Sequence, residues 1–149
     1  MQITPAHVSD IPALCELLGF LFSQEADFKP DREAQFRGLA RIIASPEIGL
    51  IIVARQDNQV VGMVSLLYTV STALGDRVAL LEDMVVSPRV RGAGVGSRLL
   101  EHAIQLARLG GCKRITLLTD RTNDSAQRFY QKHGFCFSGM IPLRLSLSE

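Results

Sequence analysis

The stretch Arg91-Gly92-Ala93-Gly94-Val95-Gly96 decides how this chain is interpreted. It follows an apolar segment, 84–86, and the break Ser87-Pro88, and it opens a segment, 97–109, with helical periodicity. Strand, glycine-rich turn and helix in this order are typical of phosphate binding. Glycines let successive N–H groups point into one concavity, and a helix N-terminus adds partial positive charge. A tight turn without a ligand is the alternative, but such a turn does not require three glycines and an arginine.

Two familiar phosphate-binding motifs do not fit this loop. A P-loop ends in Gly-Lys-Ser/Thr, whereas this chain reads Gly96-Ser97-Arg98 and has no lysine there. A dinucleotide-binding fingerprint needs a third glycine three positions after the second, and Ser97 occupies that position. Both motifs are therefore disfavoured.

Length and composition predict one cytoplasmic domain, 1–149. With a net charge of +1 and 21% charged residues, nothing indicates a nucleic-acid partner. The longest apolar runs, 17–22 and 50–54, are too short to span a membrane, and the N-terminus lacks a signal pattern. The three cysteines are widely spaced. This spacing favours buried free thiols in a reducing cytosol over a disulfide framework or a metal site.

Periodicity and turn signals predict a mixed α/β sheet of six to seven strands, mostly antiparallel, flanked by about four helices. Asp57-Asn58 is a hairpin signal between two of the strands, and Gly110-Gly111 ends the third helix. The expected helices are 9–22, 31–44, 97–109 and 125–133, and the expected strands are 2–4, 50–54, 60–68, 78–86, 114–119, 135–138 and 143–147.

Three segments resemble the GNAT superfamily of N-acetyltransferases. The loop Arg-x-x-Gly-x-Gly after an apolar strand is similar to the coenzyme A loop of that family. The pair Glu82-Asp83, just before it, resembles the diamine (spermidine/spermine) and glucosamine-phosphate branches. A downstream block is similar to Asn-x-x-Ala-x-x-Phe-Tyr-x-x-x-Gly-Phe; its residues are Asn123, Ser125, Ala126, Phe129, Tyr130, Lys132, Gly134 and Phe135. The specific resemblance covers about 80–137.

The resemblance implies direct transfer of an acetyl group from acetyl-CoA to a primary amine, without a metal. The backbone of Gly92, Ala93, Gly94, Val95, Gly96 and Ser97, with Arg91, is then expected to hold the pyrophosphate. The amide-like pantetheine arm can pair with an exposed strand edge, for which Met84, Val85 and Val86 are placed. Asn123, Ser125 and Ala126, at the start of a helix, resemble further cofactor contacts, and Asn123 and Ser125 are also predicted to cap that helix.

Glu82 and Tyr130 are the candidate catalytic residues. An amine must lose a proton before it attacks, and Glu82 matches the position of the family's base. On a regular strand Glu82 and Asp83 point to opposite faces, but a bulge would change that parity. Both acids could instead be structural partners of arginines. Tyr130 resembles the group that faces the cofactor sulfur, although its helical spacing also suits a core position.

The acceptor is expected to be a small cationic primary amine. The segment 23–31 contains Glu25, Asp27 and Asp31 against Lys29, which would attract a cation and repel a phosphorylated sugar. An ordinary solvated acidic loop is the alternative. Three other functions stay open: a lysine or N-terminal protein acetyltransferase, a transferase using another acyl-CoA, and a non-catalytic acyl-CoA-binding module. The resemblance also allows a homodimer, and the chain end, 140–149, departs from the usual acidic or aromatic finish.

Overall fold

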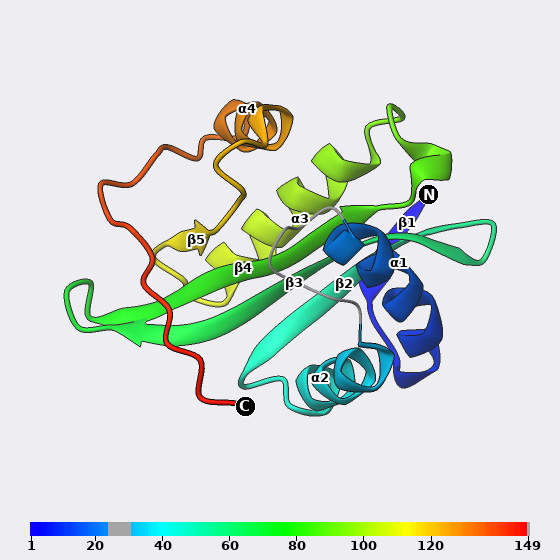
Figure 1. Ribbon diagram of the computed structural model, residues 1–149, viewed down its shortest axis with the longest axis horizontal. Helices are drawn as coiled ribbons and strands as arrows, with labels where there is room; N and C mark the ends of the chain where they lie inside the picture. Colours follow the sequence, from blue (N-terminus) through cyan, green and yellow to red (C-terminus); the bar gives the residue numbers. More distant parts are fainter. Residues whose placement is uncertain (24–30, 149) are drawn as a thin grey trace. The chain divides into compact units, whose positions relative to one another are not determined.

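The first of two compact units is built on a five-stranded sheet. The structure is a computed structural model that describes residues 1–23 and 31–148, and the units are Met1–Leu118 and Thr119–Glu149. Neighbouring strands are antiparallel from β1 to β4, and β5 is parallel to β4, which confirms a mixed, mostly antiparallel sheet (Figure 1). In sheet order the strands are β1 (Gln2–Pro5), β2 (Gly49–Gln56), β3 (Gln59–Ser71), β4 (Asp76–Val86) and β5 (Ile115–Leu117).

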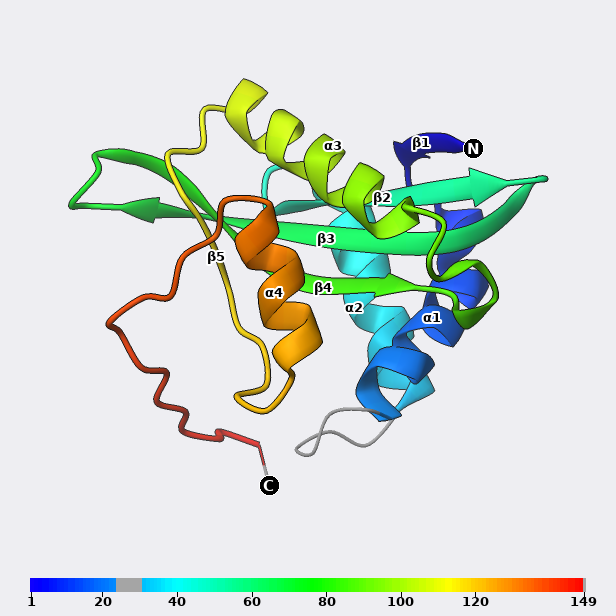
Figure 2. The same cartoon turned by 90° about the horizontal axis from the view of Figure 1, so that it is seen from above.

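Helices cover both faces of this sheet. Helices α1 (Ile11–Ser23) and α2 (Arg32–Ala44) pack on one face with Met63 and Val85, and α3 (Val95–Leu109) lies on the other (Figure 2). Gly62 faces α3, where a Cβ would come within 2.8 Å of Leu99, so the absent side chain permits close packing. Two short 3₁₀ turns, Val8–Asp10 and Pro88–Val90, precede α1 and α3; α4 (Asp124–Lys132) belongs to the second unit.

The predicted hairpin between β2 and β3 is confirmed. Asp57 and Asn58 have φ of 52° and 63°, and Gln56 pairs with Gln59 across them. Two consecutive residues in the left-handed region form the two-residue turn whose twist matches that of the flanking strands. Local turn chemistry therefore sets the pairing next to the turn, and an irregularity between Ala54 and Arg55 shifts the register beyond it.

The prediction of six to seven strands is wrong. The segments 135–138 and 143–147 form no strand in the described part of the chain, which has five strands. Leu143, Leu145 and Leu147, whose alternation suggested a half-buried strand, are 92%, 82% and 92% exposed. Alternation states which faces a strand would present, but a strand also needs a backbone partner, and that pairing is a long-range event.

Two predictions from composition have different outcomes. No helix of the described residues is long and apolar enough to cross a membrane. The prediction of buried thiols holds only for Cys15, because Cys112 is half-buried and Cys136 is exposed; all three are free. Burial raises the pKa of the Cys15 thiol.

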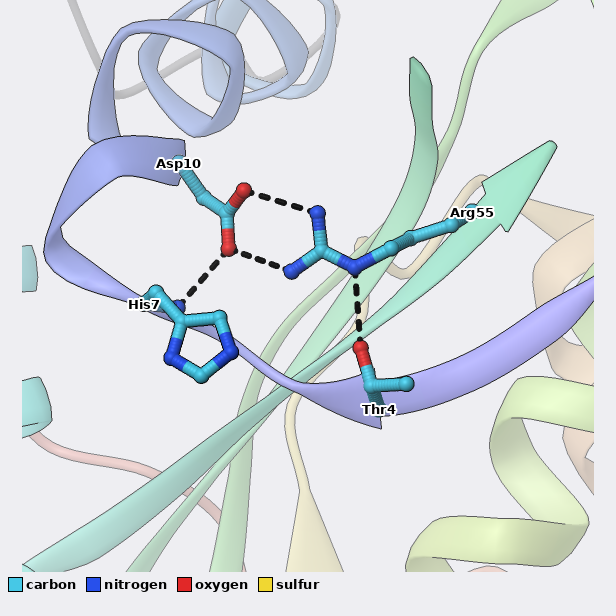
Figure 3. A network of polar contacts seen from close by, with 4 residues as sticks. All are labelled: Thr4, His7, Asp10 and Arg55. Carbon is cyan, nitrogen blue, oxygen red and sulfur yellow. Dashed lines mark hydrogen bonds and ion pairs between the residues drawn. The ribbon is translucent and has the colours of Figure 1, made fainter. Parts of the chain in front are cut away.

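An ion pair holds the start of the chain against β2 (Figure 3). The Arg55 guanidinium donates to both Asp10 carboxylate oxygens, from Nη1 to Oδ1 at 2.9 Å and from Nη2 to Oδ2 at 2.6 Å. Its Nε donates to Thr4 Oγ1 at 2.9 Å, and the His7 backbone N–H donates to Asp10 Oδ2 at 2.7 Å. Asp10 is 8% exposed. These bonds, that from Arg55 first, hold the pKa of Asp10 below its usual 3.8 against the opposing effect of burial.

Replacing this carboxylate should destabilise the fold in a pH-dependent manner. A carboxyl group with a lowered folded-state pKa stabilises above its unfolded pKa, and the contribution disappears as pH falls through the folded value. We expect Asp10→Asn to lower the free energy of unfolding by about 1.5–3 kcal/mol at pH 7. The difference should shrink below pH 3.8, the unperturbed value. Urea denaturation of both proteins at pH 7 and at a pH below 3.8 measures this difference in the free energy of unfolding. Exposed Asp57→Asn is the control, and an equal loss at both pH values would contradict the prediction.

Candidate active site

The glycine-rich loop connects β4 to α3. Gly92 and Gly94 have φ of 85° and 80°, in the left-handed region that favours glycine. Gly94 is the N-cap of α3 and accepts a 3.2 Å hydrogen bond from Arg98 N–H. The helix therefore begins at Val95, two residues before the predicted start. Val95 is buried and anchors this first turn, while Arg91, Gly92, Ala93 and Gly94 are exposed and Gly96 and Ser97 are half-buried.

The N-terminus of α3 presents unpaired backbone donors at this loop. Within residues 1–23 and 31–148, the N–H groups of Gly92, Gly94, Val95, Gly96 and Ser97 make no hydrogen bond. The first N–H groups of a helix have no intrahelical partner and carry partial positive charge. Exposed arginines, Arg91 and Arg98, flank these donors. The arrangement suits a phosphate-type anion.

The outer edge of β4 is only partly paired. Strand β5 pairs with Ala79, Leu80 and Leu81 of β4, and no other described strand follows it along this edge. The remaining edge contains Met84 and Val86, both half-buried, and Val85, whose side chain packs in the core with α1. Unpaired peptide groups on a strand edge can bind an extended, amide-containing chain.

A β-bulge in β4 decides the positions of the two acids. Ser65 of β3 pairs with Asp83 and the next residue pairs with Leu81, so Glu82 has no cross-strand partner. Glu82 is exposed. Asp83 instead shares the α1–α2 face with Ser65, whose hydroxyl donates to Asp83 Oδ2 at 3.3 Å and accepts from its N–H at 3.1 Å. The regular alternation considered in the sequence is therefore interrupted here.

The second unit contains the remaining predicted site residues. Asn123 caps α4, because its Oδ1 accepts from Ala126 N–H at 3.1 Å and from Ser125 Oγ at 3.2 Å. The capping role predicted for Asn123 is confirmed. Asn123 and Ser125 are exposed and Ala126 is half-buried.

Tyr130 lies on α4 among aromatic side chains of the same unit. Its ring makes edge contacts with Phe129 and Phe135, at centroid distances of 5.3 and 5.6 Å. Phe135 N–H donates to the Tyr130 carbonyl at 3.1 Å. Burial raises the pKa of the Tyr130 hydroxyl to about 12, so this group is a permanent hydrogen-bond donor at neutral pH.

A cavity of about 310 Å³ lies between α1 and α2. Asp83 contributes to its wall, as do Asp31 and Gln35. Of the acidic segment 23–31, Asp31 caps α2 through Ala34 N–H at 3.1 Å, whereas Glu25 and Asp27 lie outside the described residues. Sequence reasoning missed Gln35, because nothing in a polar helix position of 31–44 distinguishes a cavity wall from a solvated face.

Comparisons with known proteins identify acetyltransferases. Residues 11–135 match the model of the Acetyltransferase (GNAT) family. The aminoalkylphosphonate N-acetyltransferase of Salmonella typhimurium is 28% identical over 90% of this chain and 84% of its own length. The glucosamine 6-phosphate N-acetyltransferase of Trypanosoma brucei brucei is 30% identical over 91% and 88%. A crystal structure described as a probable acetyltransferase superposes with a TM-score of 0.85 at 25% identity, covering 100% of this chain and 99% of that one.

Proposed function

The chain belongs to the acetyltransferase (GNAT) family and is an N-acetyltransferase, and from this premise we propose that it transfers an acetyl group from acetyl-CoA directly to the primary amine of a small molecule. The proposal extends to the residues involved: the loop Arg91–Ser97 and the β4 edge Met84–Val86 for the cofactor, with Asn123, Ser125 and Ala126, and Glu82 and Tyr130 for the chemistry. The single domain, cytoplasmic location and homodimer stay predictions.

The geometry of the glycine-rich loop supports the use of acetyl-CoA most directly. Two glycines at positive φ turn the chain so that five N–H groups without partners among the described residues gather at the start of α3, between Arg91 and Arg98. A pyrophosphate supplies the negative charge and the acceptor oxygens that such a loop lacks. The β4 edge beside it, Met84–Val86, pairs with no other strand of the described residues and fits the amide-bearing arm attached to that pyrophosphate.

The proposed reaction transfers the acetyl group directly from the thioester to the amine. The amine nitrogen attacks the thioester carbonyl carbon, a C–N bond forms, the C–S bond breaks, and the sulfur leaves as a thiolate. After the attack the nitrogen carries one proton more than the amide keeps, and this proton passes to the thiolate, so that the products are the acetylated amine and the free thiol of coenzyme A. A free alkyl amine has a pKa near 10.4, so a base must remove its proton at neutral pH. Exposed Glu82 in the β4 bulge takes that proton, directly or through water. Tyr130 donates a hydrogen bond to the departing sulfur.

Charges around the cavity support a cationic acceptor. Of the described residues in its wall, Asp31 and Asp83 are acidic and none is Lys or Arg. An ammonium group is attracted there, while a phosphate or phosphonate is repelled. The two relatives named for phosphorylated or phosphonated amines therefore share the fold and the transfer chemistry, and we propose a different acceptor for this chain.

A thiol-release assay tests the proposed function. Acetyl-CoA is incubated with the protein and a panel of amino alcohols, diamines, polyamines, amino sugars, amino acids and lysine peptides, and free thiol is measured with time. We expect thiol release that depends on a small amine whose remaining groups are neutral or cationic. Little release is expected with glucosamine 6-phosphate. Acetyl-CoA binding without release on any amine would instead indicate a binding module.

Tyr130→Phe should slow turnover without weakening cofactor binding. Proton transfer from a hydroxyl with a pKa of about 12 to a thiolate with a conjugate-acid pKa near 8.5 is uphill by roughly 5 kcal/mol. The hydroxyl therefore acts as a hydrogen-bond donor, and we expect a loss of about 10²-fold in kcat. Since it stays protonated, the ratio of wild type to variant should be constant from pH 7 to about 10. Tyr68→Phe, the other tyrosine, is the control. Full turnover of Tyr130→Phe would assign Tyr130 to the core.

A further inference from the structure

The cavity between α1 and α2 has a mostly apolar wall. Leu18 and Phe22 of α1 line one side, and Leu39 and Ile42 of α2 line the other. Gly38 opens the space further, since a Cβ built there would have no atom within 4 Å. Ligand pockets have volumes of about 300–1,000 Å³, so the 310 Å³ cavity accommodates the body of a small branched molecule.

One polar group in this wall has no partner among the described residues. The Nε2 of Gln35 is buried and makes no hydrogen bond with the described part of the protein. Buried polar atoms are nearly always paired, because leaving a donor unsatisfied costs about 1–3 kcal/mol. The missing acceptor for this side-chain amide is explained if a ligand bound in the cavity supplies one.

Two carboxylates set the charge of a ligand that fits here. Asp31 Oδ1 accepts from the Ala34 N–H, and Asp83 Oδ2 accepts from the Ser65 hydroxyl. An ionised carboxylate accepts charge-assisted hydrogen bonds, so this side of the cavity favours an ammonium group. The cavity thus combines an anionic side, an apolar wall and one neutral donor.

We infer that this cavity binds the acceptor and selects a primary amine with an apolar body and a neutral oxygen that accepts a hydrogen bond from Gln35, such as a branched amino alcohol. The inference rests on the proposed acetyl transfer and specifies its acceptor. A carboxylate or phosphate on the ligand would be repelled by Asp31 and Asp83. A second ammonium, as in a diamine, would face the Gln35 donor and the apolar wall without an acceptor.

The test compares two amines that differ by one hydroxyl, leucinol and 4-methylpentan-2-amine, as acceptors of acetyl-CoA. We expect the wild-type kcat/KM to favour leucinol by about tenfold, the effect of one hydrogen bond to a donor otherwise left unpaired. Gln35→Leu removes the donor at similar volume, and the preference should fall to near one. Gln105→Leu, an exposed position on α3, should keep it. Asp83→Asn should raise the KM of both amines about tenfold and leave their ratio unchanged.

Equal kcat/KM for the two amines in the wild type, or an unchanged preference in Gln35→Leu, would overturn the inference while leaving acetyl transfer intact. If no amine is acetylated, the proposed function fails separately. The inference is then decided by calorimetric binding of the same two amines to wild type and Gln35→Leu in the presence of coenzyme A. Equal affinities there would overturn it, and a leucinol preference that Gln35→Leu removes would support it.

Discussion

Gly94→Val is expected to abolish acetyl-CoA binding. Gly94 has φ of 80° and caps α3, and a β-branched residue is strongly disfavoured in that region. A Cβ there would meet no atom within 4 Å, so the effect comes from backbone conformation rather than from a clash. Relieving the strain turns the N–H groups away from their common concavity. In wild type, a hundredfold excess of acetyl-CoA over its Kd stabilises by about 2.7 kcal/mol, or roughly 5–10 °C in Tm; the variant should show no shift.

The control uses the same substitution at another left-handed glycine. Gly75, in the β3–β4 turn, has φ of 70° and no atom within 4 Å of a built Cβ. Gly75→Val therefore introduces comparable strain away from the loop and should keep the full acetyl-CoA shift, whatever its own Tm. Gly94→Asn should retain part of the shift, because asparagine tolerates this conformation better. Undiminished binding by Gly94→Val would refute the assignment of this loop to the cofactor.

Glu82→Gln is expected to lower turnover by about 10²-fold or more near pH 7, and by much less at high pH. If Glu82 removes the amine proton, its role disappears once the amine is already neutral, near a pKa of about 10.4. The ratio of wild-type to variant kcat should therefore fall steadily from pH 7 to pH 10. The measurement is kcat against pH for both proteins, on the amine with the highest turnover in the thiol-release assay.

Two further variants distinguish the base from its neighbour. Asp83→Asn should raise KM over the whole pH range if, as proposed, this cavity carboxylate binds the amine and does not take its proton. Exposed Glu47→Gln should behave as wild type. A loss for Glu82→Gln that is uniform with pH would mean that Glu82 is structural. A steep pH dependence for Asp83→Asn alone would transfer the role of base to Asp83.

The parts of the site that depend on local backbone chemistry were predicted from the sequence. The glycine loop, the Asn123 cap and the Asp57-Asn58 turn each follow from a few adjacent residues, whose conformational preferences are set by the presence or absence of a Cβ and by short side chains that bond nearby N–H groups. The order of helices and of the first five strands follows from periodicity. These features need no knowledge of distant contacts.

Only the tertiary structure decided which acid reaches the cavity. The bulge at Glu82 shifts the register against β3, so that Asp83 joins the α1–α2 face. A strand's own pattern does not contain a bulge, because the extra residue is defined by its partner strand. The cavity itself arises from the packing of α1 against α2, as does the Gln35 Nε2 in its wall, which has no partner among the described residues.

Contacts between residues far apart in the sequence could not be predicted from the sequence either. Asp10 and Arg55 are 45 residues apart, and neither has a sequence signature for the other. The apolar alternation in 143–147 predicted a strand that the described residues do not form, since a strand exists only where another backbone completes its hydrogen bonds. The sequence by itself thus determined the glycine-rich loop, the helix cap at Asn123 and the hairpin turn, which are local. Folding decided the acid at the cavity, the ion pair and the extent of the sheet, because each requires two distant segments to meet.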